Sequence, residues 1–435
     1  MFLFKNWKRK LTTNHFIKSL SVLMAGTALS NVILAVTTPL MTRLYTPEEF
    51  GNLSVFLSIL FSVSVIASLL YDSAIPLPEK DIDAFHLFIL SSLIVIGMSI
   101  VILIVVVFLP VTAFFDVPVL GKHIWLLSLS LLGIGLFHIL NAWALRKEDY
   151  QSISKAKLIM NGSQISAQIM LGFSQLGLIG LLIGEVMGRI AGTLGYLKLL
   201  KKDEVPLKQL NMKELKKVTK RYKSFPLISS WSALLNSLGN QLPTFFLAAH
   251  FDPKTAGWFF LAQKILTVPE GLLGFSAQQV YLSQSAQQAR ASPERFMSFF
   301  WDTIKKMFVM GIIVIGMIAF IAPYAVKIVF GQQWSEAGDF LQILSILYLM
   351  KIIVNPLSAN FYVTEALKYQ VISEIIRFLL ICLSIFLSAY YFESPEASLT
   401  CISLMSSLGY LVNGLFSWYV IKKCFVKTQI GFKSN

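Results

Sequence analysis

The chain has 435 residues, of which 55% are hydrophobic and only 14% are charged, and its mean hydropathy is +0.68. Soluble proteins carry about 25% charged residues and lack repeated apolar runs of about 20 residues. This composition therefore excludes a soluble globular protein and predicts a polytopic membrane protein. The net charge of +14 does not indicate nucleic-acid binding, because the basic residues gather in the segments between apolar runs.

Apolar windows of about 19–20 residues predict twelve membrane-spanning helices. The first six are expected at residues 17–43, 47–73, 84–109, 120–145, 155–174 and 176–200, and the second six at residues 226–251, 253–283, 304–330, 336–360, 367–391 and 396–421. The basic N-terminus resembles that of a signal peptide, but the apolar run that follows continues to Leu40 and predicts a retained first span.

A short motif at the start of the second span occurs twice in the chain. Pro47 and Gly51 recur 253 − 47 = 206 positions later as Pro253 and Gly257. Thr46 is expected to cap the helix that begins with Pro47, and the second copy repeats the cap and the proline. Each copy therefore predicts a long apolar helix, a tight polar turn and a second long apolar helix.

A second pair of matching segments lies further along the chain in the same order. Asn141 and Tyr150 correspond to Asn360 and Tyr369, at an offset of 369 − 150 = 219. Chance similarity between apolar helices is the alternative explanation, but the matched residues are Pro, Gly, Asn and Tyr rather than common aliphatic residues. The two matches together predict a duplicated unit.

The distribution of basic residues predicts the orientation. With the N-terminus inside, the inner segments hold 29 Lys and Arg residues, whereas the outer loops hold 4. This asymmetry places both termini in the cytoplasm. Because each half has six spans, both halves enter from the same side, and the repeat is expected to be parallel, about an axis along the membrane normal.

The predicted fold is therefore all-α, with an N-terminal lobe at residues 1–200, a basic cytoplasmic linker at 201–225 and a C-terminal lobe at 226–435. Within the linker, Leu215, Val218 and Tyr222 share one face of a predicted helix that lysines flank. Such a helix either lies on an anionic leaflet or forms a solvated linker whose charge only sets the topology.

No nucleotide-binding loop, metal-ligand spacing or nucleophile motif appears in the sequence, and no outer loop is long enough to hold an active site. The chain is therefore not expected to be an enzyme or to need a cofactor or metal. Polar residues within the spans are the remaining functional candidates. Four amides on polar helical stripes are candidate cavity-lining residues: Asn31, Asn236, Asn240 and Gln278.

Other polar and small residues in the spans indicate helix packing. Gln164 and Gln168 in the fifth span are expected to make interhelical hydrogen bonds, and the glycines from Gly180 to Gly192 in the sixth span predict close helix contact. Glu185 with Arg189 is spaced to form an ion pair on its own helix.

Lys264 and Lys351 have no acidic residue one turn away on their own helices. A lysine at membrane depth costs about 2.5–3.5 kcal/mol on insertion scales. A water-filled cavity that receives an anion would offset this cost. The alternative is an interhelical acidic partner such as Glu270 or Glu185.

The Tyr45–Gly51 opening, the Ala322-Pro323…Phe330-Gly331 segment and the Leu178-Ile179-Gly180…Gly184 segment resemble the polysaccharide transporter family. This is the O-antigen (Wzx-type) flippase branch of the multidrug/oligosaccharidyl-lipid/polysaccharide exporter superfamily. The resemblance implies two six-helix lobes arranged as a MATE-like V around a central cavity. It also implies transport of undecaprenyl-pyrophosphate-linked oligosaccharide from the inner to the outer leaflet of a bacterial plasma membrane.

Under this hypothesis, Lys264, Lys351 and Arg377 are expected to meet the phosphates of the substrate, and the amides its sugars. Glu270, Glu374 and His138 are candidate sites for ion coupling, with Glu374 and Arg377 also spaced to pair. The expected product is an O-antigen, capsule or exopolysaccharide repeat unit. The expected partners are the lipid-linked oligosaccharide, membrane lipids, and glycan polymerase and assembly proteins, but no nucleic acid.

Two other hypotheses remain. A drug or cation antiporter of the same superfamily would need an acidic residue deep in the first lobe, and the first span has none. A glycan polymerase or ligase would need a large outer loop bearing Arg and His, and the predicted outer loops are short.

The predicted topology can be tested with reporter fusions. Fusions at Asn211 and Asn435 should report a cytoplasmic location, and a fusion at Glu393 should report the opposite side, because the basic residues concentrate in the predicted inner segments. An external reporter signal at Asn211 would contradict the parallel repeat.

Overall fold

The structure is a computed structural model that describes Leu29 and residues 32–34, 36–109, 117–197, 199, 211–364 and 366–432. Within these ranges the chain is helical, with turns between helices and no β-strand. Six of the described helices are long and apolar enough to cross a membrane. The prediction of an all-α polytopic membrane protein is confirmed.

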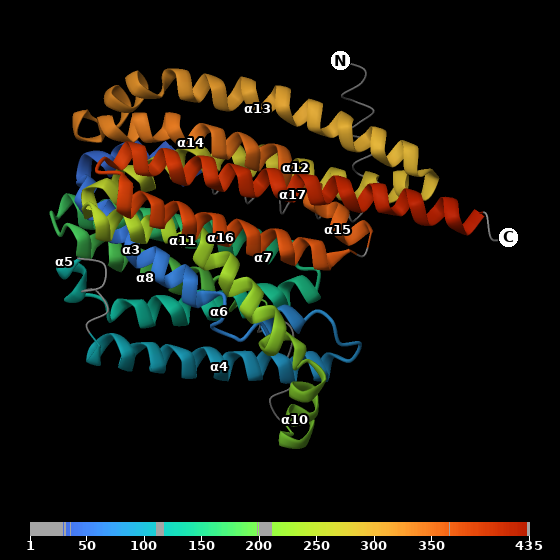
Figure 1. Cartoon of the computed structure of the whole chain (residues 1–435). Coiled ribbons are helices and arrows are strands. Elements are labelled where there is room, and N and C mark those ends of the chain that lie inside the picture. Colours follow the sequence, from blue (N-terminus) through green and yellow to red (C-terminus); the bar gives the residue numbers. More distant parts are fainter. Residues whose placement is uncertain are drawn as a thin grey trace, which may run out of the picture. The chain divides into compact units, whose positions relative to one another are not determined.

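The chain forms two compact units (Figure 1). Unit 1 comprises the described residues up to Tyr45 and the segment Val55–Ser237. Its helices are the greater part of α3 (Pro47–Ser64), η1 (Asp72–Ala74), α4 (Asp81–Phe108), α5 (Pro118–Gly121), α6 (Leu126–Arg146), α7 (Tyr150–Phe173), α8 (Leu178–Leu194), α10 (Met212–Arg221), η4 (Phe225–Ser229) and the start of α11 (Ser230–His250).

Unit 2 comprises Thr46–Ser54, which begins α3, and the chain from Leu238 onward. Its further helices are the rest of α11, then α12 (Pro253–Ala291), α13 (Pro293–Val329), η5 (Gln332–Trp334), α14 (Ser335–Val354), η6 (Asn355–Ser358), α15 (Ala359–Val363), α16 (Leu367–Tyr391) and α17 (Pro395–Phe432).

One predicted span and one predicted loop differ from the observed helices. The span expected at 47–73 ends as a helix at Ser64, and the turn that follows holds Leu69 and Leu70 at positive φ. Ser64 donates to the carbonyl of Phe61 at 3.1 Å, and serine hydroxyls that bind backbone carbonyls compete with helix formation.

The segment expected as a loop at 284–303 is helical apart from Ser292. Ser292 caps α13 by accepting from the Arg295 N–H at 3.2 Å, and Pro293 follows as the first helical residue. A hydropathy window finds only the apolar part of a helix, so it missed these polar extensions.

The duplicated motif forms both predicted helix caps. Thr46 N–H donates to Glu49 Oε2 at 2.7 Å, and Glu49 N–H donates to Thr46 Oγ1 at 3.3 Å. Asp252 accepts from the Thr255 N–H at 2.5 Å. The predicted cap at Thr46 is confirmed and is a reciprocal capping box with Glu49, whereas the second copy has the simpler one-sided cap.

The glycines of the two motif copies contact each other within unit 2. A Cβ atom at Gly51 would overlap the carbonyl of Pro253, and one at Gly257 would overlap the carbonyl of Pro47. The contact is reciprocal, because each glycine faces the proline peptide of the other copy. Phe50, which directly precedes Gly51, packs edge-on against the buried Trp334, with ring centroids 5.0 Å apart. The start of α3 is therefore anchored in unit 2.

The second pair of matching segments also has a common structural role. Tyr196 OH donates to Asn141 Oδ1 at 3.1 Å in unit 1, and Tyr281 OH donates to Asn360 Oδ1 at 2.9 Å in unit 2. In both units, therefore, this asparagine accepts a hydrogen bond from a tyrosine in another segment: Tyr196 lies in the turn after α8, and Tyr281 lies on α12.

Helix packing in unit 1 follows the predicted glycine ladder. A Cβ atom at Gly188 would lie 2.8 Å from the Met160 carbonyl, and one at Gly192 would lie 2.7 Å from the Met160 Cβ. Gln168 Nε2 donates across the same contact to the Leu181 carbonyl at 3.0 Å. The expected close packing of these helices, α7 and α8, is confirmed.

A basic side chain holds the acidic loop that precedes α4. Arg146 donates to Asp81 Oδ1 at 2.7 Å and to the Pro78 carbonyl at 2.6 Å, and Lys147 pairs with Asp81 at 2.9 Å. Asp81, one of three acidic residues between Glu79 and Asp83, is thus neutralised by the basic end of α6.

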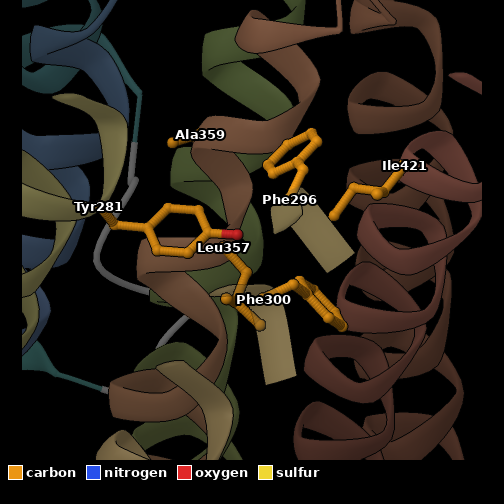
Figure 2. Close-up of a cluster of buried hydrophobic side chains, with 6 residues drawn as sticks. All are labelled: Tyr281, Phe296, Phe300, Leu357, Ala359 and Ile421. Carbon is orange, nitrogen blue, oxygen red and sulfur yellow. The ribbon is translucent and has the colours of Figure 1, made fainter. Parts of the chain in front are cut away.

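A hydrophobic core cluster joins five helical segments of unit 2: α12, α13, η6, α15 and α17. Figure 2 shows its six buried members. They are Tyr281, Phe296, Phe300, Leu357, Ala359 and Ile421. Because Tyr281 and Phe296 lie in the parts of α12 and α13 nearest Ser292, the cluster fixes the turn between these two helices.

The glycine contact predicts that a side chain added at either glycine strongly lowers the stability of the fold. Gly257→Ala should lower the melting temperature and the abundance of the protein, because overpacking against backbone costs about 1–3 kcal/mol or more. Gly316→Ala in α13 is the matched control, since a Cβ atom there meets no atom within 4 Å. Alanine at a helix interior is favoured over glycine by roughly 0.5–1 kcal/mol, so the control should be neutral or stabilising. Equal melting temperatures for the two variants would contradict the contact.

Candidate functional site

Lys351 lies near the end of α14 and is half-buried. Its Nζ atom lies 4.4 Å from the ring centroid of Tyr348, one helical turn earlier. Among the residues that the structure describes, no carboxylate oxygen lies within 4.0 Å of this ammonium group. An aromatic face offsets part of the desolvation of a cation, but it leaves the N–H donors available to an anion.

Arg377 on α16 lies in the same unit and is paired. Its Nη2 donates to Glu374 Oε2 at 2.6 Å, and its Nη1 donates to Tyr410 OH on α17 at 2.7 Å. A Cβ atom at Gly409 would lie 2.7 Å from Arg377 Cγ, so this glycine leaves the space that the arginine stem occupies. The predicted pair of Glu374 and Arg377 is confirmed.

Glu270 on α12 completes the group. It accepts a hydrogen bond from Asn355 Nδ2 at 3.2 Å. Lys351 is within electrostatic range of both Glu270 and Arg377 and of the tyrosines on α14 and α17. Six residues thus form what we call the unit 2 cluster: Glu270, Tyr348, Lys351, Glu374, Arg377 and Tyr410. Its formal charges balance, but only Arg377 has a close carboxylate partner.

The other predicted site residues are more dispersed. Lys264 is half-buried on α12, the helix of Glu270, and Gln278 is half-buried further along the same helix. Asn236 and Asn240 are exposed on α11. Asn31 lies outside the described residues.

Unit 1 contains a second charged group. Arg189 pairs with Glu185 at 2.8 Å, both are buried, and Gln164 Nε2 donates to Glu185 Oε1 at 2.5 Å. His138 on α6 is in electrostatic range of Arg189 and Lys157 and of Asp72. The predicted ion pair on α8 is confirmed. The carboxylate of Glu185 is therefore bound by Arg189 and Gln164 within unit 1.

Three residues of these groups were not predicted. Tyr348 precedes Lys351 by three positions, a spacing that places both on one helix face and could have identified it. Tyr410 gave no comparable pattern, because its contact with Arg377 joins two different helices. Lys157 stands near the predicted start of a span and was counted there as a topology residue.

Among the described residues, no three His, Cys, Asp or Glu side chains come together to hold a metal ion. The groups available in unit 2 are ammonium, guanidinium, carboxylate and phenol. They can bind an anion, exchange ion-pair partners or exchange protons.

Comparison with known families and structures gives a consistent result. Residues 40–339 match the family described as "Polysaccharide biosynthesis protein". No curated protein sequence matched significantly.

Several solved structures share the fold. An inward-facing multidrug resistance MATE family transporter of the MOP superfamily aligns with a TM-score of 0.74 and 15% identity, over 91% of this chain and 98% of the other. The lipid II flippase MurJ in an inward closed conformation aligns with a TM-score of 0.64 and 16% identity, over 94% and 90%. A MOP superfamily transporter from Pyrococcus furiosus aligns with a TM-score of 0.62 and 15% identity, over 93% and 95%.

The ion pair of unit 1 predicts a loss of stability when one partner is neutralised. Glu185→Gln should lower abundance and melting temperature, because stranding a buried charge costs about 3–5 kcal/mol. Glu214→Gln is the control, since its pair with Lys217 at 3.4 Å is exposed and such pairs contribute roughly 0–1 kcal/mol. A Glu185→Gln protein as stable as wild type would show that Arg189 finds another partner.

Proposed function

Because the chain belongs to the polysaccharide biosynthesis protein family, we propose that it is a flippase for lipid-linked oligosaccharides. It moves an undecaprenyl-pyrophosphate-linked repeat unit of an O-antigen, capsule or exopolysaccharide across the bacterial plasma membrane by alternating access. The family match supports a role in polysaccharide biosynthesis, and the MurJ fold supports transport of a lipid-linked substrate. Both termini would lie in the cytoplasm, with glycan polymerase and assembly proteins as further partners.

The observation that carries this proposal is Lys351. It is a cation inside an apolar helix whose described contacts are an aromatic ring and no close carboxylate. A lysine in a membrane span costs about 2.5–3.5 kcal/mol to insert. A binding role explains why this cost is tolerated, since the pyrophosphate of the substrate supplies the missing anion.

The surrounding groups suit a pyrophosphate and a sugar. Arg377 can bind phosphate oxygens through two N–H groups at once, and its pair with Glu374 keeps it neutralised when no substrate is bound. Tyr348 and Tyr410 add hydroxyl donors and ring faces. Lys264 is proposed to contact the phosphates as well. Asn236, Asn240, Gln278 and Asn31 are proposed to contact the sugars.

The unit 2 cluster also contains candidate coupling groups. Glu270 and Glu374 belong to the same cluster as the cations that are proposed to bind the substrate. We include both carboxylates, with His138 in unit 1, as the proposed proton sites.

A drug or cation antiporter is the second candidate, favoured by the structural likeness to a multidrug resistance transporter. This function would use a free carboxylate to bind a cation. In unit 1, however, Asp72 accepts from Ser68 at 2.5 Å and Glu185 is paired with Arg189. The proposal of an anionic substrate therefore accounts better for the described charges.

Charge substitutions test the function directly. Lys351→Gln and Lys264→Gln should reduce glycan export about tenfold or more at unchanged protein abundance, because one phosphate contact with a charged group contributes roughly 1.5–3 kcal/mol. Lys264→Arg should keep much of the activity, because guanidinium also binds phosphate. Export is measured in cells that depend on this protein, and abundance is measured by immunoblotting.

Lys327→Gln is the matched control, because Lys327 is exposed near the end of α13. The control should leave export unchanged. Normal export by Lys351→Gln would exclude its role in substrate binding. Low abundance of Lys351→Gln would instead indicate that it neutralises Glu270. Cation-dependent drug efflux without glycan export would favour the antiporter.

A further inference from the structure

The linker helix α10 is docked on unit 1 by its apolar face. Leu215 and Val218 are buried, and α10 packs against α4 (Figure 1). Two polar contacts support the docking: the Asn211 N–H donates to His86 Nε2 at 3.3 Å, and Tyr71 OH donates to the Thr219 carbonyl at 3.3 Å. The apolar face is therefore covered by protein and is not available to enter lipid.

The position of α10 along α4 sets its depth. His86 is five residues from Asp81, where α4 begins, which is about 7.5 Å at 1.5 Å per residue. The headgroup layer on each side of the hydrocarbon core is about 5–8 Å thick. The docking point therefore lies at the height of the headgroups if α4 enters the membrane near its first residue.

The docking point is also on the outer perimeter of unit 1. His86, Leu93 and Ile100 are seven residues apart and share one face of α4. Leu93 is 57% exposed and Ile100 is 53% exposed, and such an apolar face on a long membrane helix is suited to lipid. α10 therefore docks near the N-terminal end of α4, next to a helix face that is suited to lipid.

The face of α10 that points away from the protein is basic. Six exposed side chains, five on α10 and one just after it, form what we call the basic face: Lys213, Lys216, Lys217, Lys220, Arg221 and Lys223. Within α10, Glu214 is the one acidic residue, and it pairs with Lys217 at 3.4 Å. Trp231, at the start of α11, is 65% exposed and is of the residue type that is enriched at membrane interfaces.

We propose that the basic face of α10 is a binding surface for the headgroups of anionic phospholipids. The charge is complementary to phosphatidylglycerol, the depth matches its phosphate, and the perimeter position makes it accessible from the bilayer. Each basic residue near an anionic surface strengthens binding roughly fivefold. The site is independent of the substrate cluster in unit 2, so it does not rest on the proposed function.

Lipid retention tests this surface without any transport assay. The full-length protein is placed in nanodiscs of phosphatidylcholine and phosphatidylglycerol at 3:1, extracted in mild detergent, and its retained lipids are quantified by mass spectrometry. Wild type should retain phosphatidylglycerol well above its share of the bilayer. The Lys213→Gln, Lys216→Gln, Lys220→Gln variant should bind it roughly 100-fold more weakly and lose this enrichment.

The matched control removes three exposed charges elsewhere, at Lys305, Lys306 and Lys422, and should keep the enrichment. Replacing the three α10 lysines with arginine should also keep it. High salt should reduce the enrichment of phosphatidylglycerol on the wild-type protein, because it screens exposed charges. This measurement does not depend on whether any variant folds. Equal loss in the α10 and control variants, or unchanged enrichment in the α10 variant, would overturn the proposal. An acidic protein partner would then be the better occupant.

Discussion

Where α3 and α12 cross, the backbones of Gly51 and Gly257 are in contact, and the architecture of unit 2 depends on this approach. No other residue fits, because a Cβ atom on either glycine would overlap a carbonyl of the opposite helix. The contact joins two copies of one motif, so each helix presents the same proline peptide and the same glycine. Phe50 then brings the start of α3 into the core of unit 2, next to Trp334.

The two units handle buried charge in different ways. In unit 1, the guanidinium of Arg189 is matched by Glu185 on its own helix and supported by Gln164. In unit 2, Arg377 is matched in the same manner, but Lys351 has an aromatic ring in place of a close carboxylate. Breaking a buried ion pair by removing one partner is strongly destabilising, so the described charge pairs of both units constrain their helices, whereas Lys351 is held by an aromatic face.

The sequence predicted those features that depend on neighbours along the chain. The capping box at Thr46, the ion pairs on α8 and α16 and the glycine ladder of α8 each follow from spacing within one or two helices. Features made by side chains from different helices were missed, such as the contact of Tyr410 with Arg377. Polar helix extensions beyond an apolar core were also missed, because the hydropathy of residues 284–303 does not distinguish a helix from a loop. The end of α3 at Ser64 was also missed, because the residues that follow it remain apolar.

The length of α12 has a mechanical consequence. Its 39 residues span about 58 Å, roughly twice the thickness of the hydrocarbon core. One end lies at the glycine crossing, and the other end is locked to α13, α15 and α17 by the cluster in Figure 2. A tilt of about 10° around the crossing would move the far end by about 10 Å for a rod of this length. In a straight rod, a small rotation at the tight backbone contact would thus give a displacement comparable to the diameter of a helix, and Pro269 within α12 is the position at which this rod would bend instead.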